Sequence, residues 1–394
     1  MRGWGLRGPV VLALIAVGSL LAASSASAQV QQSGDQGQNG APKHIFYIMM
    51  ENHGYSQIIG NRADAPFINS LASRVGNATD YFGVTHPSLP NYLAAVSGNF
   101  QGIWDDCAAG ASSFCAPEEF IPGAGDGTDG NYLTPEQIAS ASATAHYFDG
   151  QNIVDQLESH GLSWKAYMQS IPSVGSDVEY APTVQTGGGP VTVKLYAQKH
   201  NPFMYFSDIN YPGSARLNDI VPFDQFGVDL RSGHVPNFVW ISPDQCHDMH
   251  GISPDQAALI GIPSCGYPDS GLDHGAIKLG DQFLKATVSQ IMASHVWQTT
   301  NSSIIITWDE DDYSGFAGIS TSPTGVGGVI LGGNHVPTLV INSNDQGHQV
   351  DNVPANHYTT LGTIQQLWHL GCLAQTCTIP KSQLLTPLFS DNQP

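Results

Sequence analysis

The chain has 394 residues, and its 13 Lys and Arg against 33 Asp and Glu give a formal net charge of −20 at pH 7. So acidic a protein is a poor candidate for binding nucleic acid or an anionic membrane through charge attraction. Only 12% of the residues are charged, whereas Gly and Pro number 43 and 25. This composition indicates long structured loops, and the length suits an α/β core that carries insertions.

The N-terminus has the pattern of a secretory signal over residues 1–28. Arg2 and Arg7 precede an apolar stretch from Val10 to Leu21, and small residues at 25–28 provide a cleavage site. The apolar stretch is short for a bilayer span. We therefore expect an exported protein, extracellular or periplasmic, without stable membrane anchoring. An uncleaved membrane anchor is the alternative.

Residues 29–42 are rich in Gln, Gly, Ser and Asn and are expected to form a disordered leader. Loss of the signal removes two basic residues and no acidic one, which leaves 11 basic against 33 acidic residues and a net charge of −22. Residues 43–394 are expected to form a single domain. Nothing in the sequence sets the oligomeric state.

The six cysteines fall in three close pairs, namely Cys107 with Cys115, Cys246 with Cys265, and Cys372 with Cys377. Export would place them in an oxidising compartment, where disulfides persist. We therefore predict three local disulfides in that pairing, although other pairings of six cysteines remain open. A Cys-zinc site is the competing interpretation, but the sequence has no Cys-x-x-Cys pair.

Predicted strands and helices alternate along the chain. Strands are expected at His44 to Met50, Ser163 to Met168, Phe238 to Ile241, Ile304 to Trp308, and Pro337 to Asn342. Helices are expected at Phe67 to Val75, Leu89 to Ser97, Asn152 to His160, Leu279 to Ser294, and His357 to Leu370. Long loops are expected at Gly98 to Gln137 and at Gly315 to Gly333. Continuous apolar strands alternating with helices predict a three-layer α/β/α sandwich with a mostly parallel central sheet.

Acidic and amide side chains follow two of the predicted strands directly. Glu51 and Asn52 come after the first strand, and Asp309 to Asp312 come after the Ile-rich strand at 304–308. In an α/β sheet, ligands bind at the carboxyl ends of strands. Carboxylate and amide oxygens suit Mg²⁺, Ca²⁺, Mn²⁺ or Zn²⁺, and four adjacent acids repel one another unless a cation lies among them. The alternatives are a helix cap or turn at the first pair and a solvated acidic turn at the second.

A hydroxyl at a predicted helix start stands between these two segments in the sequence. Pro90 favours a helix that begins there, which places Ser88 near the cap. Free N–H groups and the positive end of the helix dipole bind phosphate and stabilise an alkoxide. The segment therefore indicates a metal-activated serine for phosphoryl chemistry. A plain N-cap is the structural alternative, and Thr85 is the competing hydroxyl.

Histidine is unusually frequent, with 15 in the chain. His247 and His250 follow a predicted strand, the run Lys199-His200-Asn201-Pro202 and His274 precede other elements, and His357 begins a helix. A lone histidine is usually structural. Several at loop and helix starts, in a chain with few Lys or Arg, indicate groups that bind phosphate or donate protons. Nearby acids are expected to raise the imidazole pKa values, so activity should be best in mildly acidic to neutral solution.

Three runs of sequence together resemble a known family. They are Tyr47-Ile48-Met49-Met50-Glu51-Asn52, Thr85-His86-Pro87-Ser88-Leu89-Pro90-Asn91-Tyr92 and Ile306-Thr307-Trp308-Asp309-Glu310. They are similar to the secreted phosphoesterase family of bacterial and fungal acid phosphatases and phosphocholine-type phospholipases C, a branch of the alkaline phosphatase superfamily. The resemblance covers roughly residues 43–370 and implies an alkaline phosphatase-like fold with long loop insertions.

The resemblance implies roles for individual residues. One divalent metal ion would be held by Glu51, Asn52, Asp309 and Glu310. Ser88 would be the nucleophile. His250 and His247 would be catalytic residues, and His250 would protonate the leaving alcohol. Three further residues would surround the phosphoryl oxygens, namely Asn91, Asn201 and His274. The family often has Gly after its Asp-Glu pair, where this chain has Asp311-Asp312.

The hypothesis that results is a secreted, metal-dependent phosphomonoesterase of acid phosphatase type, which hydrolyses small phosphate esters through a phosphoserine. A phospholipase C or other phosphodiesterase acting on diester lipids is the first alternative. A catalytically inactive secreted binding protein is the second, and the intact set of expected metal ligands and nucleophile argues against it. A sulfatase would need a Cys/Ser-x-Pro-x-Arg motif, which the sequence lacks.

Overall fold

The computed structural model describes residues 40–115, 134–265, 274–312, 333–344 and 347–389. These residues all belong to one compact unit of the chain, residues 36–394. The predicted signal peptide lies outside the described residues, as do most of the predicted leader and most of the predicted Gly-rich loop at 315–333.

Eight strands form the central sheet. They are β1 (His44–Met50), β2 (Gly76–Ala78), β4 (Trp164–Met168), β7 (Ile220–Pro222), β8 (Phe238–Ser242), β9 (Ser302–Trp308), β10 (Thr338–Asn342) and β11 (Gln349–Asp351). Their order across the sheet is β11-β2-β10-β9-β1-β8-β4-β7. Every neighbouring pair is parallel except those that involve β10, which runs antiparallel to both β9 and β2. The sheet is therefore mostly parallel, as predicted.

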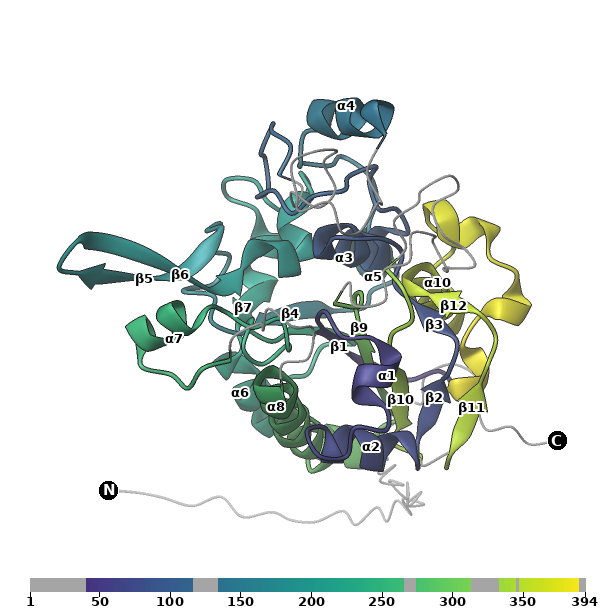
Figure 1. The fold of residues 1–394 in the computed structure, drawn as a ribbon. Coiled ribbons are helices and arrows are strands. Elements are labelled where there is room, and N and C mark those ends of the chain that lie inside the picture. The colour runs from purple at the N-terminus through teal and green to yellow at the C-terminus, as the bar shows by residue number, and fades with distance from the viewer. Residues whose placement is uncertain (1–39, 116–133, 266–273, 313–332, 345–346, 390–394) are drawn as a thin grey trace, which may run out of the picture. The chain divides into compact units, whose positions relative to one another are not determined.

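Helices cover both faces of this sheet. The α-helices are α1 (Tyr55–Ile58), α2 (Pro66–Ala72), α3 (Ser88–Ser97), α4 (Pro135–Ala143), α5 (Ile153–Ser159), α6 (Asp224–Ser232), α7 (Pro254–Ile260), α8 (His274–Met292), α9 (His295–Thr299) and α10 (His357–Trp368). Figure 1 shows α3, α5 and α10 on one face and α2, α6 and α8 on the other. Within these layers α10 packs on α3, and α2 packs on α8. The predicted three-layer α/β/α fold class is confirmed.

Two small sheets lie beside the main one. β3 (Tyr81–Phe82) pairs with β12 (Ala355–Asn356), and β5 (Tyr180–Thr186) forms an antiparallel hairpin with β6 (Gly189–Ala197). The hairpin was not predicted, because most of its side chains are exposed or half-buried and its sequence lacks a continuous apolar run. The predicted loop Gly98 to Gln137 extends too far, because its last residues, from Pro135, belong to α4.

The middle of the sheet is buried on both faces. Every residue of β1, β8 and β9 is buried, and the rings of Tyr47 on β1 and Trp240 on β8 stack with centroids 4.8 Å apart. Burying one large apolar side chain stabilises a fold by about 1.5–3 kcal/mol. In the parallel register of β1 and β9, the last residues of the two strands, Met50 and Trp308, are paired. The carboxyl ends of β1 and β9 are therefore held side by side.

All six cysteines form the three predicted disulfides, Cys107–Cys115, Cys246–Cys265 and Cys372–Cys377. The alternative of a Cys-zinc site is therefore wrong. Among the described helices, none is both long enough and apolar enough to pass through a bilayer.

Gly83 lies where backbone segments approach closely. A Cβ atom at this position would lie 2.5 Å from the carbonyl oxygen of Asp309 and 2.8 Å from Cα of Gly333. Both contacts are with backbone, which cannot move aside as the end of a side chain can. The segment after β9 therefore depends on the absence of a side chain at residue 83.

We predict that Gly83→Ala lowers the free energy of unfolding by about 1–3 kcal/mol, because overpacking forces backbone shifts. Gly150→Ala is the matched control, since a Cβ there would meet no atom within 4 Å. Chemical denaturation of both variants measures the difference. Equal stability of Gly83→Ala and the wild type would show that the segment around Asp309 can relax without cost.

Candidate active site

The two polar pairs expected from the sequence lie together at the carboxyl ends of β1 and β9. The backbone N–H of Asn52 donates to Asp309 Oδ1 at 3.2 Å, and the N–H of Asp309 donates to the last carbonyl of β1 at 3.0 Å. Glu51, Asp309 and Glu310 are each no more than 1% exposed. The strand register thus brings three buried carboxylates and one carboxamide together.

Ser88, the first residue of α3, joins these two pairs. Its Oγ lies 2.9 Å from Glu51 Oε2 and 3.2 Å from Glu310 Oε1. The oxygen thus lies between two carboxylates. Because the hydroxyl has one proton, it can donate to only one of them at a time. The N-cap of α3 is Pro87, whose side chain makes no capping hydrogen bond, and the side chain that bonds a backbone N–H of the first turn is Asp106. The interpretation of Ser88 as a plain N-cap is therefore wrong.

Lys199 brings a positive charge to the serine. Its Nζ donates to Ser88 Oγ at 3.2 Å and to Asp106 Oδ2 at 2.8 Å, and it lies 3.4 Å from His250 Nε2. Burial alone would lower the pKa of Lys199, but the carboxylates of Asp106 and Glu51 raise it above its usual range. The lysine is therefore charged at any ordinary pH. Lys199 therefore places a cation beside the serine, at a site where the scarcity of Lys and Arg had led us to expect histidines as the groups that bind phosphate.

Two buried histidines each lie between a carboxylate of the site and a second carboxylate behind it. His86 Nδ1 lies 2.6 Å from Glu310 Oε2, and its Nε2 lies 3.1 Å from Asp311 Oδ1. Burial opposes protonation of this ring, but the two carboxylates raise the pKa of His86 to about 10. His86 is therefore an imidazolium that links the two acids, and Asp311, which departs from the family pattern, is one of its partners.

His200 makes the corresponding link on the other side of the site. Its Nε2 lies 3.2 Å from Glu51 Oε1, and its Nδ1 lies 3.1 Å from Asp248 Oδ2. The ring also stacks on Tyr92, with centroids 5.2 Å apart. Burial and the charge of Lys199 lower the pKa of His200, whereas burial and the charge of Glu51 raise the pKa of Asp248. A neutral ring at His200 is the state these surroundings favour.

The donor set at the ends of β1 and β9 fits a hard divalent cation. Burial raises the pKa of Glu51 to about 7, and burial with neighbouring acids raises the pKa of Asp309. Asp309 Oδ2 is buried without a hydrogen-bond partner among the described residues. The Asn52 carboxamide faces Glu310 Oε1 at 3.2 Å and Glu51 Oε2 at 3.1 Å, and with its oxygen turned to them it adds an oxygen ligand. Oxygen-rich sets of this kind hold Ca²⁺, Mg²⁺ or Mn²⁺.

His250 lies at this site, but in a state that differs from the expected one. Its Nδ1 contacts the carbonyl of Gly251 at 3.0 Å and its Nε2 faces the Lys199 ammonium. Burial and that ammonium lower the pKa of His250 to about 3. The expectation that nearby acids raise this pKa is wrong, because Asp248 bonds the backbone N–H of His250 and leaves the ring to the lysine.

His247 and His274 make their contacts elsewhere. His247 Nδ1 pairs with Asp244 at 2.9 Å, and His274, whose side chain is 67% exposed, pairs with Asp64. No described contact joins either ring to the residues around Ser88. The catalytic role expected of His247 and the phosphate-binding role expected of His274 therefore have no support in the structure, because each ring is paired with a carboxylate away from Ser88.

The two asparagines expected around phosphate are buried. Asn91 Oδ1 accepts from the N–H groups of Val84 and Thr85 at 2.7 and 3.1 Å, and its Nδ2 donates to the Thr85 carbonyl at 2.6 Å. These bonds hold the segment before Ser88 in place. They also use most of the hydrogen-bonding capacity of the Asn91 carboxamide, so little of it remains for phosphate. Asn201 Nδ2 donates to the hydroxyl of Tyr196 at 3.1 Å.

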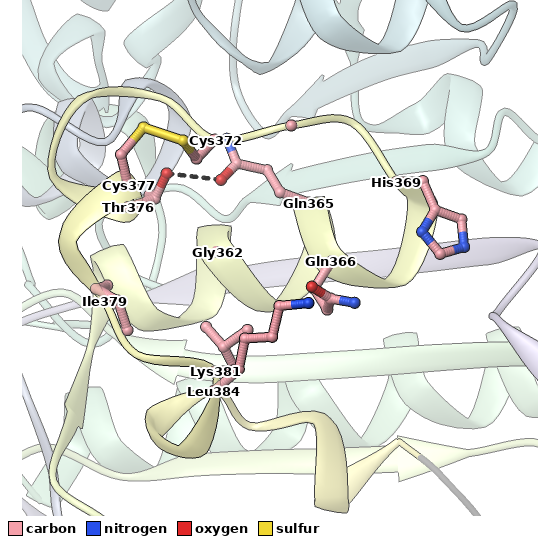
Figure 2. Close-up of a pocket in the computed structure, with 11 residues that line it drawn as sticks. Gly362, Gln365, Gln366, His369, Cys372, Thr376, Cys377, Ile379, Lys381 and Leu384 are labelled. Atoms are coloured by element: carbon pink, nitrogen blue, oxygen red, sulfur yellow. Dashed lines mark hydrogen bonds between the residues drawn. A yellow bond between two sulfur atoms is a disulfide. The ribbon is translucent and has the colours of Figure 1, made fainter.

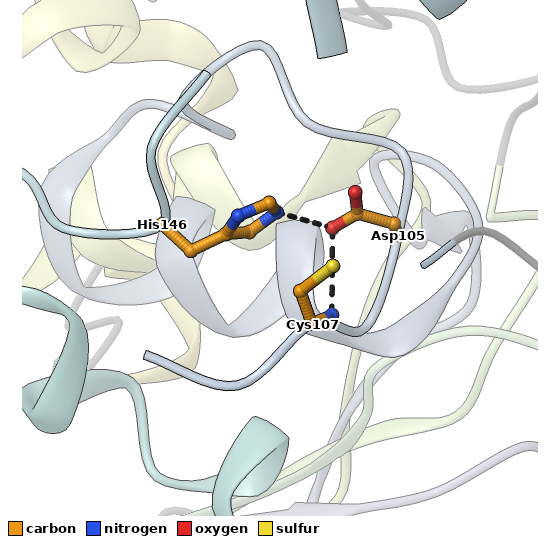
Figure 3. A group of neighbouring side chains, drawn as sticks. All are labelled: Asp105, Cys107 and His146. Atoms are coloured by element: carbon orange, nitrogen blue, oxygen red, sulfur yellow. Dashed lines mark hydrogen bonds and ion pairs between the residues drawn. The ribbon is translucent and has the colours of Figure 1, made fainter. Parts of the chain in front are cut away.

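Asp105, Cys107 and His146 form a second cluster of possible metal ligands (Figure 3). His146 Nε2 lies 2.5 Å from Asp105 Oδ1, and the Cys107 sulfur is bonded to Cys115. A disulfide sulfur is not a thiolate, which is the form of cysteine that binds metals. Two ligands remain, fewer than a zinc site uses. The cluster is therefore a structural ion pair that holds the loop around residue 106.

A cavity of about 430 Å³ lies at the C-terminal end of α10. Figure 2 shows Gln366, His369 and Lys381 around it, with the Cys372–Cys377 disulfide at its edge. None of its lining residues belongs to the group around Ser88. This cavity therefore does not provide the chemistry found at the ends of β1 and β9.

Comparison with known proteins identifies the family. The model of the phosphoesterase family matches residues 61–261 and 266–371. A phosphatidylinositol-3-phosphatase of Mycobacterium tuberculosis is 28% identical over 328 residues, which cover 83% of this chain and 77% of that protein. A solved structure of a protein in the alkaline phosphatase superfamily from Vibrio parahaemolyticus is 14% identical, with a TM-score of 0.43, and the match covers 88% of this chain and 71% of that one.

Two acid phosphatases are also similar to the chain. The probable acid phosphatase of Kluyveromyces lactis is 27% identical over 53% of this chain and 39% of its own length. The acid phosphatase of Aspergillus fumigatus is 23% identical over 91% of this chain and 62% of its own length. The chain thus spans less than two thirds of the length of these two relatives. The family match confirms the resemblance, and it includes two of the three sequence runs that carried it, residues 85–92 and 306–310. The chain belongs to the phosphoesterase family and is a hydrolase that acts on phosphoric ester bonds.

Proposed function

We propose that the protein is a metal-dependent phosphomonoesterase of acid phosphatase type, with Ser88 as the nucleophile that forms a phosphoserine intermediate. The observation that carries the proposal is the position of Ser88 Oγ, which lies within 3.2 Å of Glu51, Glu310 and Lys199. A hydroxyl that lies between carboxylates able to accept its proton and beside a cation able to stabilise its oxygen has the surroundings of an activated nucleophile. The names of the relatives, acid phosphatases and a phosphatidylinositol-3-phosphatase, support a monoester as the substrate.

The chain's own residues carry out two tasks in this mechanism. Lys199 donates to Ser88 Oγ and stabilises the negative charge on this oxygen once the hydroxyl has given its proton to one of the two carboxylates that accept from it, Glu51 or Glu310. The oxygen then attacks phosphorus, and the bond between phosphorus and the leaving alcohol breaks. The first turn of α3 offers backbone N–H groups, and its positive dipole end favours the oxygens of the transferring group. Burial of the serine and the lysine keeps water from screening these interactions.

The divalent ion would be held by Glu51, Asn52, Asp309 and Glu310, and when bound it supplies positive charge beside the serine and the phosphoryl oxygens. His86 and His200 hold two of these carboxylates from behind, at 2.6 and 3.2 Å. Such supporting contacts fix the orientation of ligands and are costly to lose. Two of the four expected ligands are thus held in place by His86 and His200 before any metal binds.

We also propose that the enzyme works outside the cytoplasm, as an extracellular or periplasmic protein. The pattern of a secretory signal at residues 1–28 and three disulfides support this location, because disulfides persist in oxidising compartments. Small phosphate esters are the expected substrates, and the names of the two acid phosphatase relatives support this expectation.

We predict that Ser88→Ala loses activity by on the order of 10³-fold or more, because the covalent intermediate can no longer form. Thr85→Ala is the matched comparison, since Thr85 is the other hydroxyl in the segment and its Oγ1 donates to the His86 carbonyl at 3.2 Å. Turnover of a chromogenic phosphate monoester, with melting temperatures as a folding control, measures both. Near-normal turnover in Ser88→Ala with loss in Thr85→Ala would reverse the assignment.

Metal binding should reverse the effect of one substitution on stability. At neutral pH and without metal, Asp309→Asn should be more stable than the wild type, because an amide replaces a buried acid whose ionised form is disfavoured by burial and by the neighbouring acids Glu51 and Glu310. With metal, it should be less stable than the wild type, because a ligand is lost. Melting temperatures with and without chelator measure the two signs, and elemental analysis should find close to one equivalent of metal in the wild type. A substitution effect that is the same in both conditions would contradict the metal site, as would full activity of metal-free protein.

The low pKa of His250 predicts that this ring is not the general acid. Since the pKa falls from an ordinary value near 6.5 to about 3, the ring is neutral across mildly acidic and neutral solution. His250→Gln should therefore slow the hydrolysis of alkyl and nitrophenyl phosphates equally. The substitution removes the contact between the imidazole ring and Lys199, but it does not remove a proton donor for the leaving group. A selective loss on alkyl phosphates, whose leaving groups need protonation, would restore the acid role.

The low pKa of His250 also determines how this residue changes the free energy of unfolding as the pH falls. Between about pH 6.5 and 3 the unfolded chain binds a proton at His250 that the folded protein does not, so this histidine makes the fold less stable as the pH falls. The stability lost in His250→Gln should therefore be smaller at pH 5 than at pH 8. Denaturation of both proteins at the two pH values checks this.

A further inference from the structure

Asp106 bonds two of the donors that flank the nucleophile. Its Oδ1 accepts from the backbone N–H of Leu89 at 3.0 Å, and its Oδ2 accepts from Lys199 Nζ at 2.8 Å. The same Nζ lies 3.2 Å from Ser88 Oγ. One carboxylate thus bridges the first turn of α3 and the cation beside Ser88.

A phosphoryl group attacked by Ser88 would use the same two donors. A backbone N–H at a helix start and an ammonium group are typical partners of phosphate oxygens. A carboxylate has acceptors of the same kind and charge of the same sign. The side chain of Asp106 is 20% exposed and that of Lys199 is 10% exposed, whereas Ser88 is 1% exposed. Of the three residues, Asp106 is therefore the one that solvent reaches most easily.

The backbone on both sides of Asp106 is held in place. Asp105 is paired with the buried His146 (Figure 3). Cys107 is bonded to Cys115, and its carbonyl accepts from the Tyr205 hydroxyl at 2.8 Å. Because both neighbours are fixed, the Asp106 carboxylate is presented to the site by a structured loop. Rotation of this one side chain is enough to release both donors.

We propose that Asp106 is a built-in competitor for the phosphoryl group. Its carboxylate holds the Leu89 N–H and Lys199 in the free enzyme and gives them up to the substrate. Binding of the substrate and of the phosphate product is weakened by the cost of displacing it, and product release is correspondingly faster. The inference rests on the proposed function, because it assumes phosphoryl transfer at Ser88.

The competitor makes the site sensitive to the charge of the ligand. A doubly charged monoester or inorganic phosphate is repelled by the Asp106 carboxylate more strongly than a singly charged diester. Removal of the charge should therefore favour the doubly charged ligands more. If Asp106 only positioned Lys199, its removal would instead lower the turnover number and weaken the binding of every anion.

The experiment compares the metal-loaded wild type with Asp106→Asn and Asp106→Ser. Isothermal titration with inorganic phosphate measures binding without turnover, and steady-state kinetics on a monoester and a diester measure KM and kcat separately. Glu136→Gln is the matched control, because it removes one exposed acidic charge from the first turn of α4. Melting temperatures establish that each variant is folded.

Both Asp106 variants should bind inorganic phosphate about tenfold more tightly than the wild type, since close like charges are worth at least that much. KM for the monoester should fall by a similar factor, KM for the diester by less, and kcat should not rise. Unchanged or weaker phosphate binding in the variants, with normal binding and turnover in the wild type, would overturn this inference alone. A wild type that neither binds phosphate nor hydrolyses the monoester would overturn the proposed function, and the inference with it.

Discussion

The structure around Ser88 depends on the burial of three carboxylates at the ends of two neighbouring strands. Transfer of a charged group out of water is costly unless an opposite charge or hydrogen bonds compensate it. Here the compensation comes from outside the strands. Lys199 approaches Ser88 from one side, and His86 lies against Glu310 at 2.6 Å. A bound cation would complete the balance, since Asp309 Oδ2 has no hydrogen-bond partner among the described residues.

The apolar core makes this concentration of charge possible. β1, β8 and β9 are buried along their whole length, and their parallel register delivers the polar residues that follow β1 and β9 to one place. The segment after β9 is held further by the His357 ring, whose Nε2 lies 2.7 Å from the Asp309 carbonyl. The charged groups are thus positioned by contacts that are themselves mainly apolar or backbone contacts.

The sequence was sufficient to predict the strands that carry the site. β1 has the bounds that its apolar run indicated, and the segments after β1 and β9 were recognised from acids that directly follow buried strands. The hairpin of β5 and β6 could not be recognised in this way, because its side chains are largely exposed and its pattern has no buried face. Local patterns of apolar residues therefore predicted the longer strands of the central sheet, and they missed its three-residue strands β2, β7 and β11 as well as the hairpin.

The residues around the site were harder to predict, because they depend on which loops lie next to each other in the folded protein. Lys199 stood in a recognised motif, but nothing in the sequence showed that its ammonium lies beside Ser88 and not in solvent. His247, His250 and His274 have similar sequence settings, yet only His250 lies next to Lys199, while the other two pair with Asp244 and Asp64. The spacing of residues along a loop does not determine the direction in which each ring points.

The helix that begins with Ser88 has every one of its residues buried. It packs against α10 on the face of the sheet, and it has no exposed side along which it could loosen by itself. Local opening usually begins in segments with few buried contacts. The backbone that carries Ser88 should therefore stay in place until the core itself unfolds, so heat should displace this residue only in the temperature interval in which the native fold is lost.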